Sequence, residues 1–380
     1  MIKIKNQVIE NILYLFFDKI IKLLLYGILI VSITRYLGPE RFGIYSYSLA
    51  IIMILSSVST LGLKGIVIRE VIKRSESSSL LLSQSIILIT AFTSFLYFLT
   101  VLFAQTQGRE EVKIALILLG IVLIFKSSEV VRYYFEAKIK SKKCVIIDTL
   151  VNLIFTSLKL CFIYFDFGFN YLLALFSFEY LIHGMLILSL VKKESITIDL
   201  TFNKVESLYL IKSSWPLIIS SASWVIYTKM DQLMVKNILG FESSGLYSSA
   251  IQLSEFLVFI PTIIAFSIIP KIESYTNESS KTSSYQSLYN LVTGISLLMS
   301  LLLTFFSEEI IVILYGNEYI EASKVLVISS WSLVFFSFAI VSGQYLVYRD
   351  LQKITMYRHL FGLVLNGVLN YFLLIHVGVE

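Results

Sequence analysis

Lysines and carboxylates inside long apolar stretches are the residues of this sequence whose chemistry most needs an explanation. Six lysines and six acidic residues lie within or beside such stretches: Lys19, Lys22, Lys64, Lys126, Lys159 and Lys229, and Asp18, Glu129, Asp148, Glu179, Asp231 and Glu255. A charge at the centre of a bilayer costs about 2.5–3.5 kcal/mol on insertion scales. Each such residue therefore pairs with another charge, faces a water-filled cavity or extends its charge to the membrane surface.

The first apolar stretch carries Asp18, Lys19 and Lys22, and these residues allow two interpretations. Asp18 and Lys22 are four residues apart with the acid first, which is the favourable order for an ion pair on a helix. Lys19 would then extend its ammonium group to the membrane surface. In the other interpretation, the three residues form a polar stripe on the wall of a cavity.

Two further groups of charges are spaced as pairs within one helix. Lys126, Glu129 and Arg132 follow each other at intervals of three residues, so Glu129 can offset either cation. Glu179 and His183 are four residues apart, and a satisfied pair is favoured over a proton relay. A structural role is therefore the favoured interpretation of both groups.

Lys159, Lys229 and Asp231 are not explained by a partner on their own helix. Lys159 has no acidic residue within one helical turn, so its partner belongs to another helix or to a ligand. Lys229 and Asp231 are two residues apart and point to different faces of a helix that Pro216 should bend. A binding role is favoured for these three residues, whereas Glu255 is left open between a proton carrier and a hydrogen-bonded core acid.

Membrane-spanning helices are the elements that must position these residues. The sequence is 57% apolar and 15% charged, with a mean hydropathy of +0.81, whereas about a quarter of the residues in soluble domains are charged. A helix needs about 20 apolar residues to cross the hydrocarbon layer. On this basis we expect eleven spans, at about 12–34, 44–66, 80–104, 114–131, 145–165, 170–191, 213–238, 246–269, 286–306, 323–347 and 357–377. The first is expected to be a retained helix and not a signal peptide, because no small-residue cleavage site accompanies it.

Lysine and arginine are unevenly divided between the two sets of alternate loops. The loops on the side of the N-terminus hold 19 of these residues, and the loops on the other side hold 6. Because loops rich in positive charge stay in the cytoplasm, the N-terminus is expected to be cytoplasmic. The consistent alternation also supports the count of eleven spans, which would place the C-terminus outside.

One turn between two spans occurs twice. Residues 37–46 read LGPERFGIYS and residues 239–248 read LGFESSGLYS, with six of ten positions identical at a constant offset of 202. Chance similarity is one explanation, because turns draw on few residue types. Duplication of a half-transporter is the other. Both copies are expected on the external side, so a duplication would give a parallel repeat.

We therefore expect an all-α polytopic membrane protein with two parallel-repeat helical bundles around a central polar cavity. The expected divisions are a six-helix bundle at 1–191, a cytoplasmic linker at 192–212 and a C-terminal bundle at 213–380. The second bundle would contain five spans and lack a twelfth. No separate soluble domain is expected, because the loops are short.

Several functional classes have no support in the sequence. The motifs HExxH and GxSxG and the phosphate-binding P-loop are absent, and His183, His359 and His376 are scattered. Cys144 and Cys161 have no metal-type spacing, so neither a metal site nor a disulfide framework is expected. Nucleic-acid binding is not expected either, because membrane topology explains the basic loops.

Long stretches of the sequence resemble one known family. The matching pieces include LGLKGIVIREVIK at 61–73, YYFEAKIKSKK at 133–143 and YGNEYIEASKVL at 315–326, together with residues 16–50, 214–272 and 343–370. They resemble the Wzx-type O-antigen flippases of the polysaccharide-transporter branch of the MOP superfamily. Lys64 departs from the family pattern, in which an acidic or small polar residue is usual.

The resemblance implies a transporter and not an enzyme. Its expected substrate is an undecaprenyl-pyrophosphate-linked oligosaccharide, flipped by alternating access across the bacterial inner (cytoplasmic) membrane for O-antigen lipopolysaccharide, capsule or a related surface polysaccharide. Membrane lipids, and polymerase and chain-length proteins of the same pathway, are the expected partners, and nucleic acid is not. A pyrophosphate and a sugar need a polar, net cationic path through the hydrocarbon layer, while the lipid tail can stay outside it.

The residues expected to line that path are mainly lysines, because lysine is an adequate point charge for phosphate. The cations expected to bind the pyrophosphate are Lys22, Lys126, Lys159 and Lys229. Asp18 and Asp231 are expected to hold these cations or contact sugar hydroxyl groups, and Asp18, Asp231 and Glu255 are the polar cavity residues that are candidates for ion coupling. No catalytic residue, metal ligand or bound cofactor is expected, and coupling to H+, to Na+ or to the membrane potential is left open.

Three other functions compete with this interpretation. A cation-coupled antiporter for drugs or other small molecules, from the same superfamily, predicts a cavity dominated by acids, whereas the candidates here are lysines. A membrane-embedded polysaccharide polymerase should have a long external loop rich in arginine, whereas the external loops expected here are short. A scaffold without transport activity is the third alternative.

Overall fold

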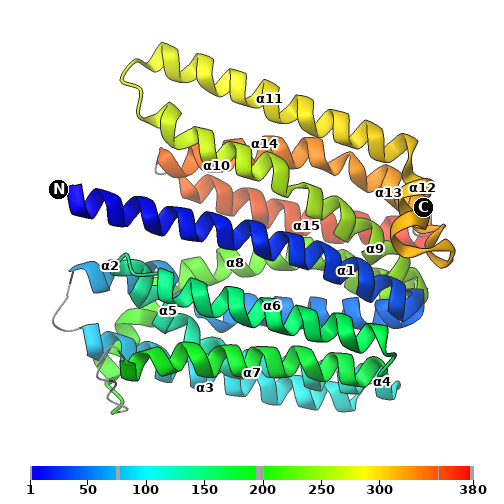
Figure 1. Cartoon of the computed structure of the whole chain (residues 1–380), viewed down its shortest axis with the longest axis horizontal. Coiled ribbons are helices and arrows are strands. Elements are labelled where there is room, and N and C mark those ends of the chain that lie inside the picture. The colour runs from blue at the N-terminus through cyan, green and yellow to red at the C-terminus, as the bar shows by residue number, and fades with distance from the viewer. Residues whose placement is uncertain (1, 74–77, 194–197, 199–200, 350, 377–380) are drawn as a thin grey trace. The chain divides into compact units, whose positions relative to one another are not determined.

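The computed structural model consists of helices and short connections, without a strand, in the part of the chain that it describes (Figure 1). That part comprises residues 2–73, 78–193, 198, 201–349 and 351–376, with side chains for all of these except 2–20, 78 and 352. The elements are α1 (Ile2–Ser59), α2 (Lys64–Lys73), α3 (Ser78–Gln105), α4 (Glu110–Ile124), η1 (Phe125–Ser127), α5 (Ser128–Ala137), α6 (Lys142–Tyr164), α7 (Phe169–Lys193), α8 (Lys204–Leu239), α9 (Phe241–Leu257), α10 (Phe259–Glu273), α11 (Glu278–Phe305), α12 (Ser307–Tyr315), η2 (Asn317–Tyr319), α13 (Ala322–Ser330), α14 (Ser332–Tyr348) and α15 (Gln352–His376).

Nine stretches of the described chain are long and apolar enough to cross a membrane. They are Ile21–Lys73, Ser79–Gln105, Glu110–Ala137, Lys142–Tyr164, Phe169–Lys193, Phe241–Glu273, Glu278–Phe305, Ala322–Tyr348 and Lys353–His376. The first contains a kink at Gly38 that separates two of the expected spans. The expected span at 213–238 lies in α8, which is not among the nine because its middle is rich in serine and carries Lys229 and Asp231. The prediction of an all-α polytopic membrane protein is confirmed, and the span at 213–238 stays a prediction.

The chain forms two compact units, and it passes between them inside two helices. The first unit contains Met1–Ile33 and Ser48–Lys229, and the second contains Thr34–Tyr47 and Met230–Glu380. Helix α1 therefore leaves the first unit and returns to it, and α8 begins in the first unit and ends in the second. The expected division at 1–191, 192–212 and 213–380 stays a prediction, and residues 204–212 are the beginning of α8.

The first unit is held together by apolar contacts among α2 to α7. Helices α3 and α4, and α6 and α7, run side by side (Figure 1). One core cluster joins α2, α3, α5 and α8 through buried aliphatic side chains, among them Val67, Leu82, Ile89, Val130 and Leu210. Helices α3, α4, α6 and α7 are apolar around much of their circumference, as expected where one face packs on protein and another meets lipid, whereas α2 and α5 are amphipathic.

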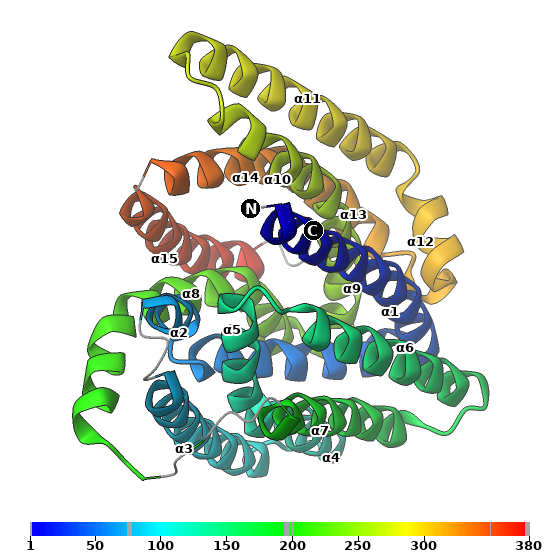
Figure 2. The ribbon, with the colours of Figure 1, turned by 60° about the vertical axis from the view of Figure 1, so that its left-hand side comes forward.

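The second unit is built from α9 to α15, the end of α8 and the kinked part of α1. Helix α11 packs along α10 and α14, and α15 packs on α14 (Figure 2). The core between α10, α11 and α14 contains Ala265, Ile269, Leu288, Val292 and Val341, all of which are buried.

The repeated turn has the same backbone conformation in both copies. Gly38 has φ 69° and ψ 168°, and Gly240 has φ 96° and ψ −177°. This region of backbone space is in practice open only to glycine. Each glycine ends one helix, and Pro39 or Phe241 begins the next, a position that suits proline because it lacks an N–H group. The shared conformation favours duplication over chance similarity.

The two copies also cross each other at a second pair of glycines. A Cβ atom on Gly43 would lie 1.8 Å from the carbonyl oxygen of Phe241, and a Cβ atom on Gly245 would lie 1.8 Å from that of Pro39. The contact is reciprocal, because Gly43 corresponds to Gly245 and Pro39 to Phe241 in the repeat. The two backbones are therefore in direct contact, as at other small-residue crossings of membrane helices. We call this contact of Gly43 and Gly245 the glycine crossing.

Candidate functional site

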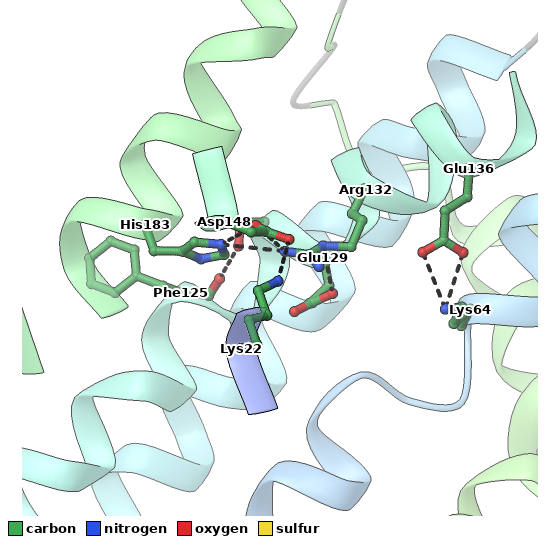
Figure 3. Close-up of polar contacts among 9 residues, drawn as sticks. Lys22, Lys64, Phe125, Glu129, Arg132, Glu136, Asp148 and His183 are labelled. Atoms are coloured by element: carbon green, nitrogen blue, oxygen red, sulfur yellow. Dashed lines mark hydrogen bonds and ion pairs between the residues drawn. The ribbon is translucent and has the colours of Figure 1, made fainter. Parts of the chain in front are cut away.

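The carboxylate of Asp148 in α6 is the centre of a group of charges in the first unit (Figure 3). Its Oδ1 atom lies 2.7 Å from Nη2 of Arg132 and 2.7 Å from Nε2 of His183. Its Oδ2 atom accepts a hydrogen bond of 3.2 Å from Nζ of Lys22. Nε of Arg132 in turn lies 3.6 Å from Oε2 of Glu129. We call these five residues the charge cluster.

Four helices bring the charge cluster together: α1 supplies Lys22, α5 supplies Glu129 and Arg132, and α6 and α7 supply the rest. The turn η1 precedes α5, and α7 approaches this turn closely at Gly184. A Cβ atom on Gly184 would lie 2.7 Å from Cβ of Phe125. The absence of a side chain at Gly184 therefore lets its neighbour His183 reach Asp148.

Within the charge cluster the carboxylate is buried, whereas the side chains of the basic residues are partly exposed. The exposed fraction of the side chain is 4% for Asp148, 31% for Lys22, 25% for Arg132 and 23% for His183. The Nη1 group of Arg132 makes no hydrogen bond with a described residue, so its two N–H donors are available to another acceptor. A buried carboxylate that fixes cations in place, while one of them keeps free donors, is an arrangement suited to binding an anion.

Lys126 adds a positive charge beside this cluster. It lies in η1, directly before α5, and its side chain is partly buried. Its ammonium group makes no hydrogen bond or ion pair with a described residue, because Glu129 pairs with Arg132 instead. Two cations and two carboxylates cancel within the charge cluster, so Lys126 gives the region an excess of one positive charge when His183 is neutral.

Lys159 is satisfied by protein groups. This side chain is almost completely buried, and its ammonium group pairs with Glu179 of α7. Nζ also lies 3.7 Å from the centre of the Phe176 ring, a cation–π contact. The alternative of a partner on another helix is thus confirmed, and a ligand would have to displace Glu179. The role of Lys159 in substrate binding stays a prediction.

The expected pair of Glu179 and His183 is wrong. Each residue instead contacts a side chain of α6: Glu179 pairs with Lys159, and Nε2 of His183 lies 2.7 Å from Oδ1 of Asp148. The spacing of four residues on α7 allowed a pair, but contacts between α6 and α7 bring stronger partners within reach.

The other predicted site residues lie in separate places. Lys229 is buried in α8 at the end of the first unit, and Glu255 is exposed in α9 of the second unit. The side chain of Asp18 lies outside the described residues. Lys64 forms an exposed ion pair of 3.1 Å with Glu136 of α5 (Figure 3), and such pairs contribute less than about 1 kcal/mol to stability.

Asp231 is held only by neutral donors. Its Oδ2 atom accepts a hydrogen bond of 3.1 Å from the hydroxyl of Tyr247 in α9, and its Oδ1 atom accepts one of 2.6 Å from the amide of Asn370 in α15. No lysine or arginine of the described chain pairs with it. The carboxylate thus links three helical segments of the second unit without a cationic partner.

The hydrogen bond from Tyr247 to Asp231 can be tested by removing one hydroxyl group. We expect Tyr247→Phe to lower the free energy of unfolding by about 1.5–3 kcal/mol, because it removes a hydrogen bond to a charged group. The measurement is the melting temperature of the purified protein in detergent. Tyr97→Phe is the control, because the Tyr97 hydroxyl makes only a long contact of 3.4 Å with the carbonyl of Ile117. Equal melting temperatures for both variants would contradict the arrangement at Asp231.

Arg132 and His183 are functional candidates that sequence spacing did not select. Asp148 stood out as an acid within a span, but nothing in its own helix indicated that Lys22, Arg132 and His183 surround it. The only available signal was the presence of unpaired charges on several spans, which required partners in other helices.

Comparison with protein families identifies the chain. The family model described as polysaccharide biosynthesis protein matches residues 8–276. The chain belongs to the polysaccharide biosynthesis protein family. A second model, MatE, matches residues 216–372 of this family member.

Two curated relatives of this polysaccharide biosynthesis protein carry informative names. The capsular polysaccharide biosynthesis protein CapF of Staphylococcus aureus is 24% identical in an alignment of 354 positions that covers 89% of this chain and 84% of CapF. The probable low-salt glycan biosynthesis flippase Agl15 of Haloferax volcanii is 24% identical over 166 residues, 43% of this chain and 35% of Agl15.

Solved structures of MOP superfamily transporters share the fold. A multidrug resistance transporter of the MATE family matches in its inward-facing conformation with a TM-score of 0.67 and 13% identity, over 93% of this chain and 88% of that one. A MOP transporter from Pyrococcus furiosus, described as having a binding pocket of reversed polarity, matches with a TM-score of 0.62 and 13% identity, over 97% and 89% of the chains. This member of the polysaccharide biosynthesis protein family is therefore a multipass membrane protein that shares its fold with transporters of the MOP superfamily.

Proposed function

We propose that this transporter flips oligosaccharide units linked to undecaprenyl pyrophosphate across the cytoplasmic membrane of a bacterium. Membership of the polysaccharide biosynthesis protein family supports a glycan as the transported group, and the similarity to the probable flippase Agl15 supports flipping as the activity. The similarity to CapF supports a capsule or another surface polysaccharide as the product. The excess of positive charge in one set of loops supports a cytoplasmic N-terminus.

The charge cluster is the observation that carries this proposal. A diphosphate needs cations with free N–H donors, and the Nη1 group of Arg132 has two. An arginine offers two parallel donors to the oxygens of a phosphate, while a lysine such as Lys22 or Lys126 adds a point charge. Asp148 fixes Lys22 and Arg132 before the substrate arrives, so less side-chain freedom is lost on binding.

Asp231 is the group that we assign to coupling. A carboxylate whose side-chain partners are the neutral groups of Tyr247, Asn366 and Asn370 can take up H+ or Na+ without first breaking an ion pair. Glu255, which is exposed in α9, is the second carboxylate of the unit proposed for this role. Alternating access would then couple the binding of a cation to the return of the empty transporter.

The proposal predicts that Arg132→Gln reduces export strongly. Loss of a charge-assisted hydrogen bond to the diphosphate is worth about 1.5–3 kcal/mol, which corresponds to at least about a tenfold reduction in transport. The measurement is complementation of a deletion strain, read as surface polysaccharide and as lipid-linked oligosaccharide accumulating on the cytoplasmic side. Lys126→Gln is expected to act in the same direction.

The control for both variants is Lys113→Gln. Lys113 pairs with Glu110 three residues away at the beginning of α4, outside the charge cluster, and its replacement should leave export unchanged. If Arg132→Gln and Lys126→Gln export polysaccharide normally at normal protein levels, the charge cluster does not take part in substrate binding. Normal surface polysaccharide in the deletion strain itself would contradict the flippase function.

A further inference from the structure

The first turns of α8 are fixed to the first unit by one buried glutamine. The side chain of Gln84 in α3 is completely buried, and its Nε2 group donates a hydrogen bond of 2.7 Å to the carbonyl oxygen of Thr201. Its Oε1 atom accepts hydrogen bonds of 2.9 Å from the backbone N–H of Asn203 and of 3.1 Å from the hydroxyl of Ser207. Leu210 is also buried, in the core that α8 shares with α2, α3 and α5. These contacts determine which side of α8 faces the protein.

The opposite side of this part of α8 is apolar and exposed. Four apolar residues follow each other at intervals of three or four positions and therefore share one face of the helix: Val205, Leu208, Ile211 and Trp215. All four are exposed, and the exposed fraction of Val205 is 80%. Lys204 and Lys212 are exposed too, and they lie four residues before and after Leu208, on the same face. We call these six residues the outer face of α8.

Most of this outer face extends beyond the hydrocarbon layer. Helix α8 has 36 residues, which would measure about 54 Å in a straight helix, whereas the hydrocarbon layer is about 30 Å thick. The predicted span begins at residue 213, and Pro216 removes a backbone hydrogen bond near this point. Figure 2 shows the beginning of α8 turned away from the direction of the rest of the helix. The bend allows the outer face to lie along the membrane surface.

The residue types of the outer face suit the headgroup region of a membrane. An exposed apolar face that continues from a span is typical of helices that lie at this level, and Trp215 stands at the border of the predicted span, where tryptophan is enriched. A lysine at this level extends its ammonium group past its apolar stem to a phosphate. The acidic residue in this part of the helix, Glu206, lies on a different side. The outer face therefore complements the charge of anionic phospholipids.

We propose that the outer face of α8 docks on the membrane surface and binds the headgroups of anionic phospholipids. Val205 and Leu208 enter the layer between the headgroups and the acyl chains, and Lys204 and Lys212 contact lipid phosphates. The hydrogen bonds to Gln84 hold the first unit to the docked helix, so docking determines where α8 enters the bilayer. This interaction is separate from the binding of the transported substrate.

Fluorescence quenching in the full-length protein tests the docking. Val205→Cys is labelled with an environment-sensitive fluorophore in a protein that carries Cys161→Ala, because Cys161 is exposed whereas Cys144 is buried. The labelled protein is placed in nanodiscs of phosphatidylcholine with or without phosphatidylglycerol. With phosphatidylglycerol we expect strong quenching by lipids that are spin-labelled near the headgroup, and little quenching by acrylamide in the water. If Val205→Cys does not accumulate, Leu208→Cys is the equivalent position.

Removal of the two lysines tests whether the charge of the lipid matters. Lys204→Gln with Lys212→Gln should lower the ratio of docked to undocked helix in phosphatidylglycerol about fivefold per lysine, the usual contribution of one lysine at an anionic surface. Lys113→Gln with Lys324→Gln removes the same charge from α4 and α13. This control variant should leave the ratio unchanged.

Two reference positions in α11 define the depth of the probe. Ser280 is exposed at the beginning of this helix, and Ser280→Cys should be quenched by acrylamide. Leu298 is exposed within the apolar part, and Leu298→Cys should be quenched by lipids that are spin-labelled deep in the acyl chain.

Three results would overturn the docking. The probe at Val205 could be as accessible to acrylamide as the probe at Ser280, in which case the outer face meets water or another protein. It could be quenched at the same depth as the probe at Leu298, in which case it belongs to the span. Equal quenching with and without phosphatidylglycerol, or no effect of the two lysine replacements, would contradict binding of anionic headgroups. None of these measurements uses export, so the proposed function is tested separately.

Discussion

Gly245→Ala is expected to lower the melting temperature of the purified protein by several degrees. The new Cβ atom would lie 1.8 Å from the carbonyl oxygen of Pro39, and neither partner is a flexible side chain that can move aside. Overpacking of this kind costs about 1–3 kcal/mol and sometimes more. Because the contact is reciprocal, Gly43→Ala should have a similar effect through the carbonyl oxygen of Phe241.

Gly294→Ala is the matched control for these two variants. Gly294 also lies within a helix, but no atom lies within 4 Å of the position of its Cβ atom. Alanine is a better helix former than glycine by about 1 kcal/mol, so this variant should melt at the same temperature or slightly higher. A melting temperature of Gly245→Ala equal to that of Gly294→Ala would contradict the close crossing of the two turns.

Lys159→Met is expected to be the most destabilising single change in the first unit. It would leave the carboxylate of Glu179 partly buried without its ion-pair partner, and breaking a buried pair in this way costs about 3–5 kcal/mol. Low protein levels in the membrane and a reduced melting temperature are the expected observations. Replacement of both partners, Lys159→Met with Glu179→Gln, should recover most of the lost stability, because the remaining group is neutral.

The double variant also decides between the two roles of Lys159. Recovery of both melting temperature and polysaccharide export would make Lys159 purely structural. Recovery of the melting temperature without export would show that transport requires the cation, as its place among the predicted substrate ligands implies. A single variant Lys159→Met as stable as the unchanged protein would contradict the ion pair.

The fold was largely predictable because a membrane restricts what a chain can do. A span must be helical and about 20 residues long, so apolar length alone located α3, α6, α7 and α11. The turn at Gly38 was visible for a related reason, since glycine followed by proline ends one helix and begins another. The identity between 37–46 and 239–248 then predicted a second kink, and Gly240 has the same left-handed backbone conformation.

The candidate site was less predictable because its contacts join different helices. Spacing along one helix suggested that Glu179 pairs with His183. In the structure, His183 contacts Asp148 and Glu179 pairs with Lys159. Nothing in a single sequence specifies which faces of α6 and α7 meet. The approach of α7 to η1 depends on Gly184, whose missing side chain makes room for Phe125. The sequence therefore identified the charged residues, whereas their partners depend on how the helices pack against each other.

The reciprocal glycine crossing has the form of an interface between two identical subunits. In a symmetric dimer, residue i of one subunit contacts residue j of the other, and residue j of the first contacts residue i of the second. Gly43 with Phe241 and Gly245 with Pro39 obey this rule when one copy is renumbered by 202. Fusion of two copies of a half-length chain that dimerised through this turn would leave such a reciprocal contact. In the fused chain the two glycines are encoded separately and can mutate independently. Each nevertheless has to stay without a side chain, because a carbonyl oxygen of the opposite turn occupies that space.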